Sequence, residues 1–143
     1  MNFHLFPGRP LLLSLAFLSL GACAADDNTA TQARLGEQVL TLEGRNGQCL
    51  LRSDNQQLPL KLKWPCQFNL RADGTLRTEM LGETPVLLIE NSLVLTAPSR
   101  DCRTEVQAVR KLPSGLLEAS PVTNLAAACP PFDWDQKLFF GLF

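Results

Sequence analysis

The stretch from Glu37 to Ser53, EQVLTLEGRNGQCLLRS, contains the strongest local fold signal in the chain. Two runs of alternating apolar and polar residues flank the dipeptide Asn46-Gly47. Asn-Gly is the strongest short hairpin signal, because both central residues of a type I′ turn need a positive φ angle. The stretch therefore predicts a β-hairpin.

Three later stretches repeat this pattern of apolar runs joined by turn residues. Their turns are expected at Asp73-Gly74, at Asn91-Ser92 and at Pro113-Ser114-Gly115. Four hairpin-like units in about 85 residues are typical of an antiparallel sandwich or a small barrel. We therefore expect a mainly β fold, a small disulfide-bonded antiparallel β-sandwich or barrel with a short C-terminal helix. Residues 37–143 suit one domain with a single core.

The N-terminal segment has the composition of a secretory signal. Residues 11–20 are apolar apart from two serines and follow the single positive charge of Arg9. A membrane-spanning helix needs about 20 apolar residues, so this shorter run predicts a signal peptide over residues 1–22. Ala22-Cys23-Ala24 also fits an ordinary signal peptidase site with cleavage before Ala25.

The four residues Leu20-Gly21-Ala22-Cys23 resemble the bacterial lipobox. The resemblance implies that Cys23 becomes a lipid-bearing N-terminus, and Ala24 after it implies an outer-membrane lipoprotein that faces the periplasm. Ordinary cleavage, which leaves a soluble periplasmic or secreted protein, is the alternative. Residues 23–36 are then the lipidated N-terminus and a flexible tether, because they are small and polar with little apolar surface to bury.

The four cysteines after Cys23 predict a disulfide framework. Cys49, Cys66, Cys102 and Cys129 form an even set in a short chain that enters an oxidising compartment. Of the three possible pairings we favour Cys49–Cys66 with Cys102–Cys129, because partners close in sequence meet most often. The alternative of a zinc site is disfavoured, since no two of these cysteines have the close spacing of zinc-binding pairs. We expect no metal.

Composition excludes several classes of function. His4, the single histidine, lies in the predicted signal, and the chain has no tyrosine. Triads and metal sites that need histidine are therefore absent from the mature chain. Loss of Arg9 with the signal changes the net charge from −1 to −2. That balance does not favour nucleic acid as a partner.

We predict no enzyme activity and no cofactor. Glycoside hydrolysis needs two carboxylates facing each other across a cleft. Carboxylates elsewhere are scattered among arginines, and the local candidates are Glu79, Glu83, Glu90, Asp133 and Asp135. Asp133 and Asp135 lie two residues apart at an expected helix start, so they are better placed to cap that helix.

The tail CPPFDWDQKLFFGLF, residues 129–143, is rich in aromatic residues. Asp133 followed by Gln136 predicts a helix N-cap, and the prolines before it end the preceding chain. The helix either caps an open end of the β core or presents a partner-binding face. The residues assigned to that face are Phe132, Trp134, Leu138, Phe139 and Phe143, with Trp64 as a further candidate.

Trp64 also has two interpretations. It precedes Pro65-Cys66 and follows Lys61 and Lys63. It is either a contact platform for a sugar or a protein, or a side chain packed on a disulfide. In the second case the two lysines lie on the solvated side of an alternating strand.

The leading functional hypothesis is a lipid-anchored periplasmic protein-binding module. Its partner would be an envelope protein, and the module would be of the inhibitor, immunity or envelope-assembly accessory type. Contact with the membrane would occur through the N-terminal lipid alone. The alternatives are a carrier barrel for a small apolar ligand and a purely structural envelope lipoprotein.

Overall fold

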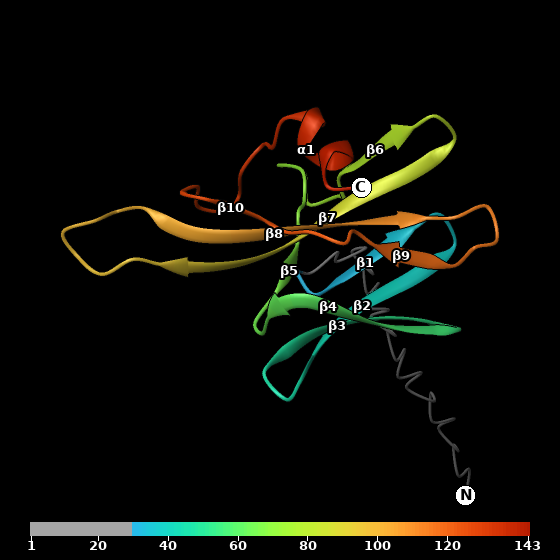
Figure 1. Cartoon of the computed structure of the whole chain (residues 1–143), viewed down its shortest axis with the longest axis horizontal. Coiled ribbons are helices and arrows are strands. Elements are labelled where there is room, and N and C mark those ends of the chain that lie inside the picture. Colours follow the sequence, from blue (N-terminus) through green and yellow to red (C-terminus); the bar gives the residue numbers. More distant parts are fainter. Residues whose placement is uncertain (1–29) are drawn as a thin grey trace, which may run out of the picture.

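The computed structural model describes residues 30–143, which form two antiparallel sheets and one short helix (Figure 1). The predicted signal over residues 1–22, the predicted lipidation site Cys23 and residues 24–29 of the predicted tether lie outside the described residues. Within residues 30–143, no helix is both long enough and apolar enough to cross a membrane.

The first sheet, sheet A, is an antiparallel meander in the order β1-β2-β3-β4. Its strands are β1 Gln32–Leu35, β2 Gln38–Arg45, β3 Gln48–Ser53 and β4 Gln56–Lys63. The predicted Asn46-Gly47 turn joins β2 to β3, with φ angles of 51° and 76°. These positive angles confirm the hairpin signal.

Strand β1 lies within the range that the sequence predicts as tether. It pairs with β2, and its Ala33 and Leu35 side chains are buried in the core. The domain therefore begins before residue 37, and the predicted boundary is wrong. Two buried apolar side chains at alternate positions are enough to hold this short edge strand.

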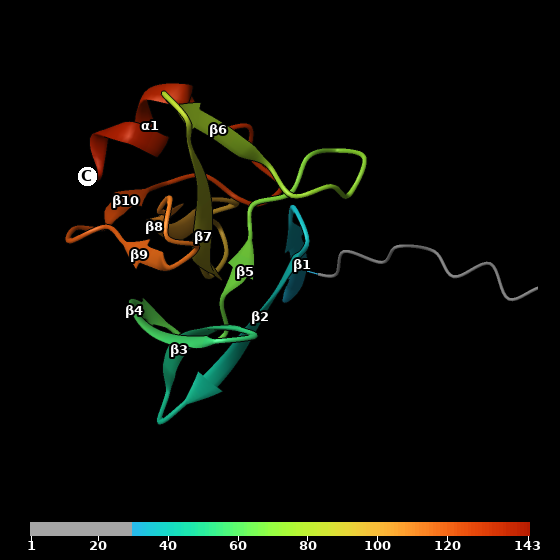
Figure 2. The same ribbon diagram turned by 90° about the vertical axis from the view of Figure 1, so that its right-hand side faces the viewer.

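The second sheet, sheet B, has the order β10-β8-β7-β5, with β6 paired to β7 and β9 to β8. Its strands are β5 Gln67–Phe68, β6 Thr78–Leu81, β7 Thr84–Val94, β8 Cys102–Lys111, β9 Leu117–Ala119 and β10 Asn124–Ala126. The helix α1, Gln136–Gly141, follows β10. Figure 2 shows sheet A on one side of sheet B and α1 on the other.

Two of the remaining predicted turns are present, and one is wrong. Pro113-Ser114-Gly115 joins β8 to β9, and Gly115 has a φ angle of 86°. Asp73-Gly74 lies in the loop between β5 and β6, although both of these strands pair with β7 and not with each other. Asn91-Ser92 lies inside β7, which pairs with β8 without interruption from Val86 to Val94.

The core between the sheets confirms the sandwich and not the barrel. Leu40, Leu51 and Leu62 of sheet A pack in one cluster with Phe68 and Ile89 of sheet B. Among residues 30–143 the two sheets remain separate layers and close into no barrel. The predicted mainly β fold with a short C-terminal helix is confirmed.

Both predicted disulfides are present with the favoured pairing. Cys49–Cys66 links β3 of sheet A to the residue before β5 of sheet B. Cys102–Cys129 links the start of β8 to the segment between β10 and α1. The first bridge holds the two sheets together, and the second fixes the C-terminal segment to sheet B.

Candidate functional site

The C-terminal segment covers the face of sheet B that points away from sheet A. Trp134, Phe139 and Leu142 are 6%, 0% and 6% exposed and pack against Val86 and Leu88 of β7. The prediction that Trp134 and Phe139 lie on an exposed partner face is therefore wrong. The helix is part of the core, as the structural interpretation proposed, but it covers a sheet face and not an open end.

The apolar run of β7 explains this position of the helix. Leu87 and Ile89 face the core between the sheets, whereas Val86 and Leu88 face the helix. A strand that is apolar on both faces needs cover on both faces. A helix as short as α1 is not stable alone in water, so docking on the sheet stabilises both elements.

The other residues of the predicted partner face differ in exposure. Leu138 and Phe143 are half-buried and pack against the same cluster. Phe132 is 43% exposed, and its ring meets Trp134 edge to face at 4.6 Å between centroids. Phe132 is thus the member of this set that keeps a large exposed surface.

Trp64 lies across the backbone of strand β2. A Cβ atom at Gly44 would be only 2.7 Å from Cγ of Trp64, so the close approach requires glycine. Lys61 and Lys63 are exposed, whereas Leu62 between them is buried. This alternation matches the expected solvated position of the two lysines, while Trp64 lies over Gly44 and is 39% exposed.

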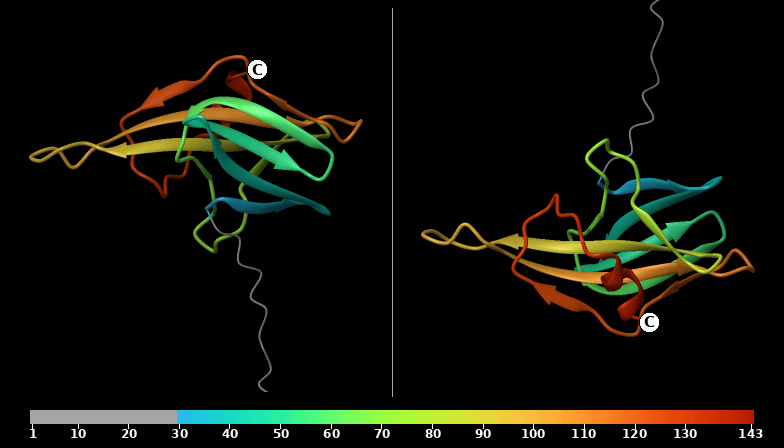
Figure 3. Two further views of the ribbon diagram at one scale, coloured as in Figure 1. Left: turned by 90° about the horizontal axis from the view of Figure 1, so that it is seen from below. Right: turned by 90° about the horizontal axis from the view of Figure 1, so that it is seen from above.

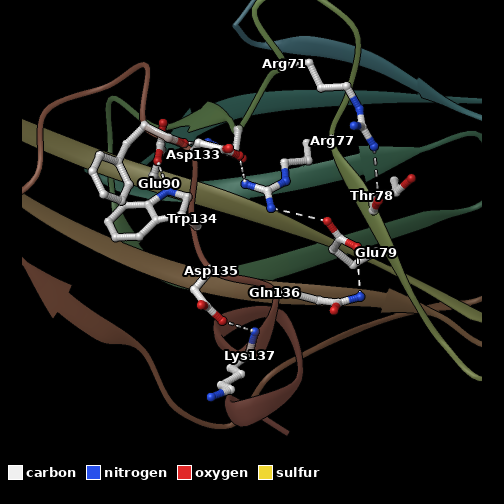
Figure 4. Close-up of polar contacts among 12 residues, drawn as sticks. Arg71, Arg77, Thr78, Glu79, Glu90, Asp133, Trp134, Asp135, Gln136 and Lys137 are labelled. Atoms are coloured by element: carbon white, nitrogen blue, oxygen red, sulfur yellow. Dashed lines mark hydrogen bonds and ion pairs between the residues drawn. The ribbon is translucent and has the colours of Figure 1, made fainter.

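A cluster of polar side chains joins the C-terminal segment to sheet B (Figure 4). Arg77 donates hydrogen bonds to Asp133 and to Glu79, the latter at 3.2 Å. Asp135, and not Asp133 as predicted, is the N-cap of α1 and accepts from the Lys137 backbone N–H. Asp133 therefore serves an ion pair with Arg77 in place of the predicted cap.

Glu90 lies buried beneath this cluster. Its carboxylate accepts hydrogen bonds from Gln67 at 3.0 Å and from the Trp134 indole N–H at 2.9 Å. Burial raises the pKa of the Glu90 carboxyl above its ordinary value of 4.5, and the hydrogen bonds act in the opposite direction. Both oxygens of the carboxylate are thus engaged in holding β5 and the C-terminal segment.

Two shallow hollows of about 360 and 390 Å³ share the residues Leu70–Ala72 and Pro131, and Glu90 lines the larger one. Asn69 lines the larger hollow; its amide nitrogen donates to Phe132 O at 3.0 Å, and its Oδ1 has no partner. No group of three or more potential metal-ligating side chains occurs among residues 30–143. The contacts of the cluster account for docking of the C-terminal segment.

The feature that sequence reasoning missed is a projecting ribbon, the arm, formed by residues 91–103. Strand β5 pairs with β7 as far as Glu90, and β10 pairs with β8 as far as Thr104. Beyond those points, β7 and β8 continue as two strands joined by the loop 95–101, and no further strand among residues 30–143 pairs with them. Figures 1 and 3 show this ribbon extending past the rest of the domain.

Three successive apolar side chains are exposed on the arm. Leu93, Val94 and Leu95 are 63%, 71% and 39% exposed. Leu93 is on the side of sheet B that faces sheet A, and Val94 is on the helix side, because side chains alternate along a strand. Neither sheet A nor the helix covers these side chains, although Cys102, opposite Val94 at the base of the arm, is buried by its bridge to Cys129.

The arm is braced at its base. The Leu95 N–H donates to Asp101 O at 3.0 Å, and the pair Val94↔Cys102 closes the strand ladder. Cys102 is bridged to Cys129, and the Ser92 and Thr104 hydroxyls meet at 2.8 Å. The sequence predicts a turn at Asn91-Ser92, but the chain turns only in the loop that follows Val94.

Comparison with known proteins identifies no relative. No family model matches the chain, and neither a curated protein nor a solved structure matches it.

Proposed function

We propose that this chain is a lipid-anchored protein-binding module of the bacterial envelope, and that the arm is its contact surface. The observation that carries the proposal is the exposure of Leu93, Val94 and Leu95 together at the end of a braced ribbon. Single exposed apolar residues are ordinary in proteins, but contiguous ones mark sites of interaction.

The arm has the chemistry of a small protein interface. Its apolar residues are followed by Arg100, Asp101 and Arg103, which supply a charged rim. Interfaces between proteins commonly combine an apolar centre with a polar rim. The strand ladder and the Cys102–Cys129 bridge hold this surface in place before binding. Binding therefore orders few additional groups, which lowers its entropic cost.

The proposed compartment rests on the N-terminal segment and on the disulfides. The lipobox-like Leu20-Gly21-Ala22-Cys23 supports a lipid anchor, and the two bridges suit an oxidising envelope. The partner is then an envelope protein that the module inhibits, neutralises or helps to assemble. The carrier alternative needs a closed barrel around a cavity, and the sandwich formed by residues 30–143 has a filled interior.

Capture from a native envelope extract tests the proposal. The bait is the oxidised chain from Asp26 to Phe143, beside a variant in which Leu93→Ser and Val94→Ser are combined. Leu125→Ser is the matched control, because Leu125 is 56% exposed but lies on β10, off the arm. We expect one stoichiometric partner, identified by mass spectrometry, with the wild type and the control and not with the arm variant.

Equal capture by the arm variant would contradict the arm as the contact surface. Capture of no partner by any of the three baits would contradict the binding function, and would favour a purely structural lipoprotein. Near-ultraviolet circular dichroism of each bait shows that the serine substitutions leave the core packing intact.

A further inference from the structure

The arm also has an unpaired strand edge. The Asn69 N–H donates to Leu88 O, so the main-chain groups of Leu88 point toward β5. Main-chain groups alternate in direction along a strand, so those of Ser92 and Val94 point the same way. Strands β5 and β6 pair with β7 between Thr84 and Glu90. In the described part of the chain, no strand pairs with β7 at Ser92 or Val94 on this edge.

The opposite side of β7 supports the same assignment. The Leu95 N–H donates to Asp101 O, so the main-chain N–H and C=O groups of the odd-numbered residues of β7 point toward β8. Ser92 and Val94 stand opposite Thr104 and Cys102 in the register. Their N–H and C=O groups thus point away from β8, toward the free edge, and are available to an added strand.

This free edge lacks the protection that other edges of the molecule have. Exposed edges are usually blunted by charged side chains, by proline or by being short. Edge strand β1 carries Arg34, β4 carries Lys61 and Lys63, and β10 is only three residues long. By contrast, no charged side chain occurs between Glu90 and Arg100, a range that includes the outer part of β7 and most of the following loop.

We infer that the free edge of β7 at Ser92 and Val94 binds an extended, uncharged segment of the partner as an additional strand. This inference rests on the proposed function and specifies how the arm would bind. In strand addition, main-chain hydrogen bonds supply affinity, and alternate side chains supply selectivity. The exposed Leu93 and Val94 lie on the two faces of the edge, so apolar side chains on the added strand would pack beside them. A charged segment would find no counter-ion on β7 itself between Glu90 and Val94.

Amide hydrogen exchange measured by NMR tests the inference on the oxidised chain from Asp26 to Phe143. The probe is an acetylated and amidated peptide of alternating threonine and valine. We expect the peptide to slow exchange of the Ser92 and Val94 amides about tenfold, which is the scale of one net hydrogen bond. The control is the same peptide N-methylated at every residue, which removes the donors of both of its edges. We expect no protection from it.

A pair of substitutions at one position separates main-chain from side-chain effects. Ser92→Pro removes an N–H that points to the free edge, and proline is tolerated where a strand N–H faces solvent. Ser92→Ala is the matched control, because it loses only the hydroxyl contact with Thr104. We expect protection of Val94 by the peptide to survive Ser92→Ala and to be lost in Ser92→Pro. The N-methylated peptide keeps the test decisive on the wild type if the proline variant does not fold.

The outcomes distinguish this inference from the proposed function. No protection by the alternating peptide overturns strand addition, while partner capture that depends on Leu93 and Val94 would leave the proposed function standing. Peptide protection without any captured partner would support strand addition and contradict the proposed envelope partner. A concentration-dependent dimer in sedimentation, abolished by Ser92→Pro, would assign the edge to a second copy and overturn a partner strand.

Discussion

Glu90 combines burial with two hydrogen bonds that cross from one element to another. It accepts from Gln67 of β5 and from Trp134 of the C-terminal segment while it stands 1% exposed in β7. The sequence places Glu90 in an apolar run, where a carboxylate is conspicuous, but its donors lie 23 and 44 residues away. Only the fold brings these three side chains together.

The pH dependence of stability should reveal Glu90. Its pKa is raised above 4.5 by burial, so just above that pH the native state keeps a proton that the unfolded chain has released. The free energy of unfolding contributed by Glu90 is therefore fully present below about pH 4.5 and is lost as pH rises through the native pKa. Urea unfolding at a series of pH values measures this loss.

Glu90→Gln is the reference variant, because the glutamine side chain can still accept a hydrogen bond from the Trp134 indole and does not ionise. We expect the stability of the wild type relative to the variant to fall as pH rises from about 4.5 through the native pKa of Glu90. All other carboxylates are shared by the two chains and cancel in the difference. A difference that stays constant with pH would show that burial does not raise the pKa of Glu90.

At the scale of elements, the C-terminal helix shows what an amphipathic pattern leaves open. The sequence indicates a helix with an aromatic stripe, and α1 forms within the predicted tail. The same stripe can cover the chain's own sheet or a partner's surface. The choice depends on whether the second face of sheet B has another cover, and that is a property of the tertiary structure.

Phe139→Ala should strongly destabilise the fold. The ring is fully buried against sheet B, so its removal leaves a cavity, and truncation of a buried phenylalanine costs about 3–5 kcal/mol. Urea unfolding monitored by tryptophan fluorescence measures the change. Phe132→Ala is the matched control, because that ring is 43% exposed and should cost about 1 kcal/mol or less. Equal small losses for both variants would argue against core packing of α1.

At the scale of the whole molecule, residues 30–143 form the folded domain, and the predicted lipid anchor at Cys23 would attach this domain to a membrane. The domain begins with β1 at Gln32, nine residues after Cys23. A diacylated N-terminus would hold it to a membrane firmly, since each buried methylene contributes about 0.8 kcal/mol. The proposed lipid anchor and the proposed binding surface lie in different parts of the chain, so each can be tested separately.

Intact mass spectrometry of the membrane fraction tests the anchor. We expect an N-terminus at Cys23 that carries the mass of a diacylglyceryl group, and we expect Cys23→Ser to move the chain out of the membrane fraction. An N-terminus at Ala25 without acyl mass would instead establish ordinary cleavage. The control is the Leu93→Ser and Val94→Ser variant, which should remain in the membrane fraction.

The sequence by itself determined the features that depend on neighbouring residues. Asn46-Gly47 and Pro113-Ser114-Gly115 form turns because their backbone preferences are local, and the cysteine spacing favoured the pairing that is present. Alternation around Lys61 and Lys63 placed the lysines in solvent for the same reason. The mainly β class follows from these local signals.

The tertiary structure alone decided which surfaces are covered. Asn91 and Ser92 lie within β7 and form no turn, because β7 pairs there with the long strand β8. Trp134 and Phe139 are buried because sheet B has two apolar faces, whereas Leu93 and Val94 are exposed because the arm extends beyond sheet A and the helix. Burial depends on contacts between residues far apart in the chain, and a linear pattern records only how apolar each residue is.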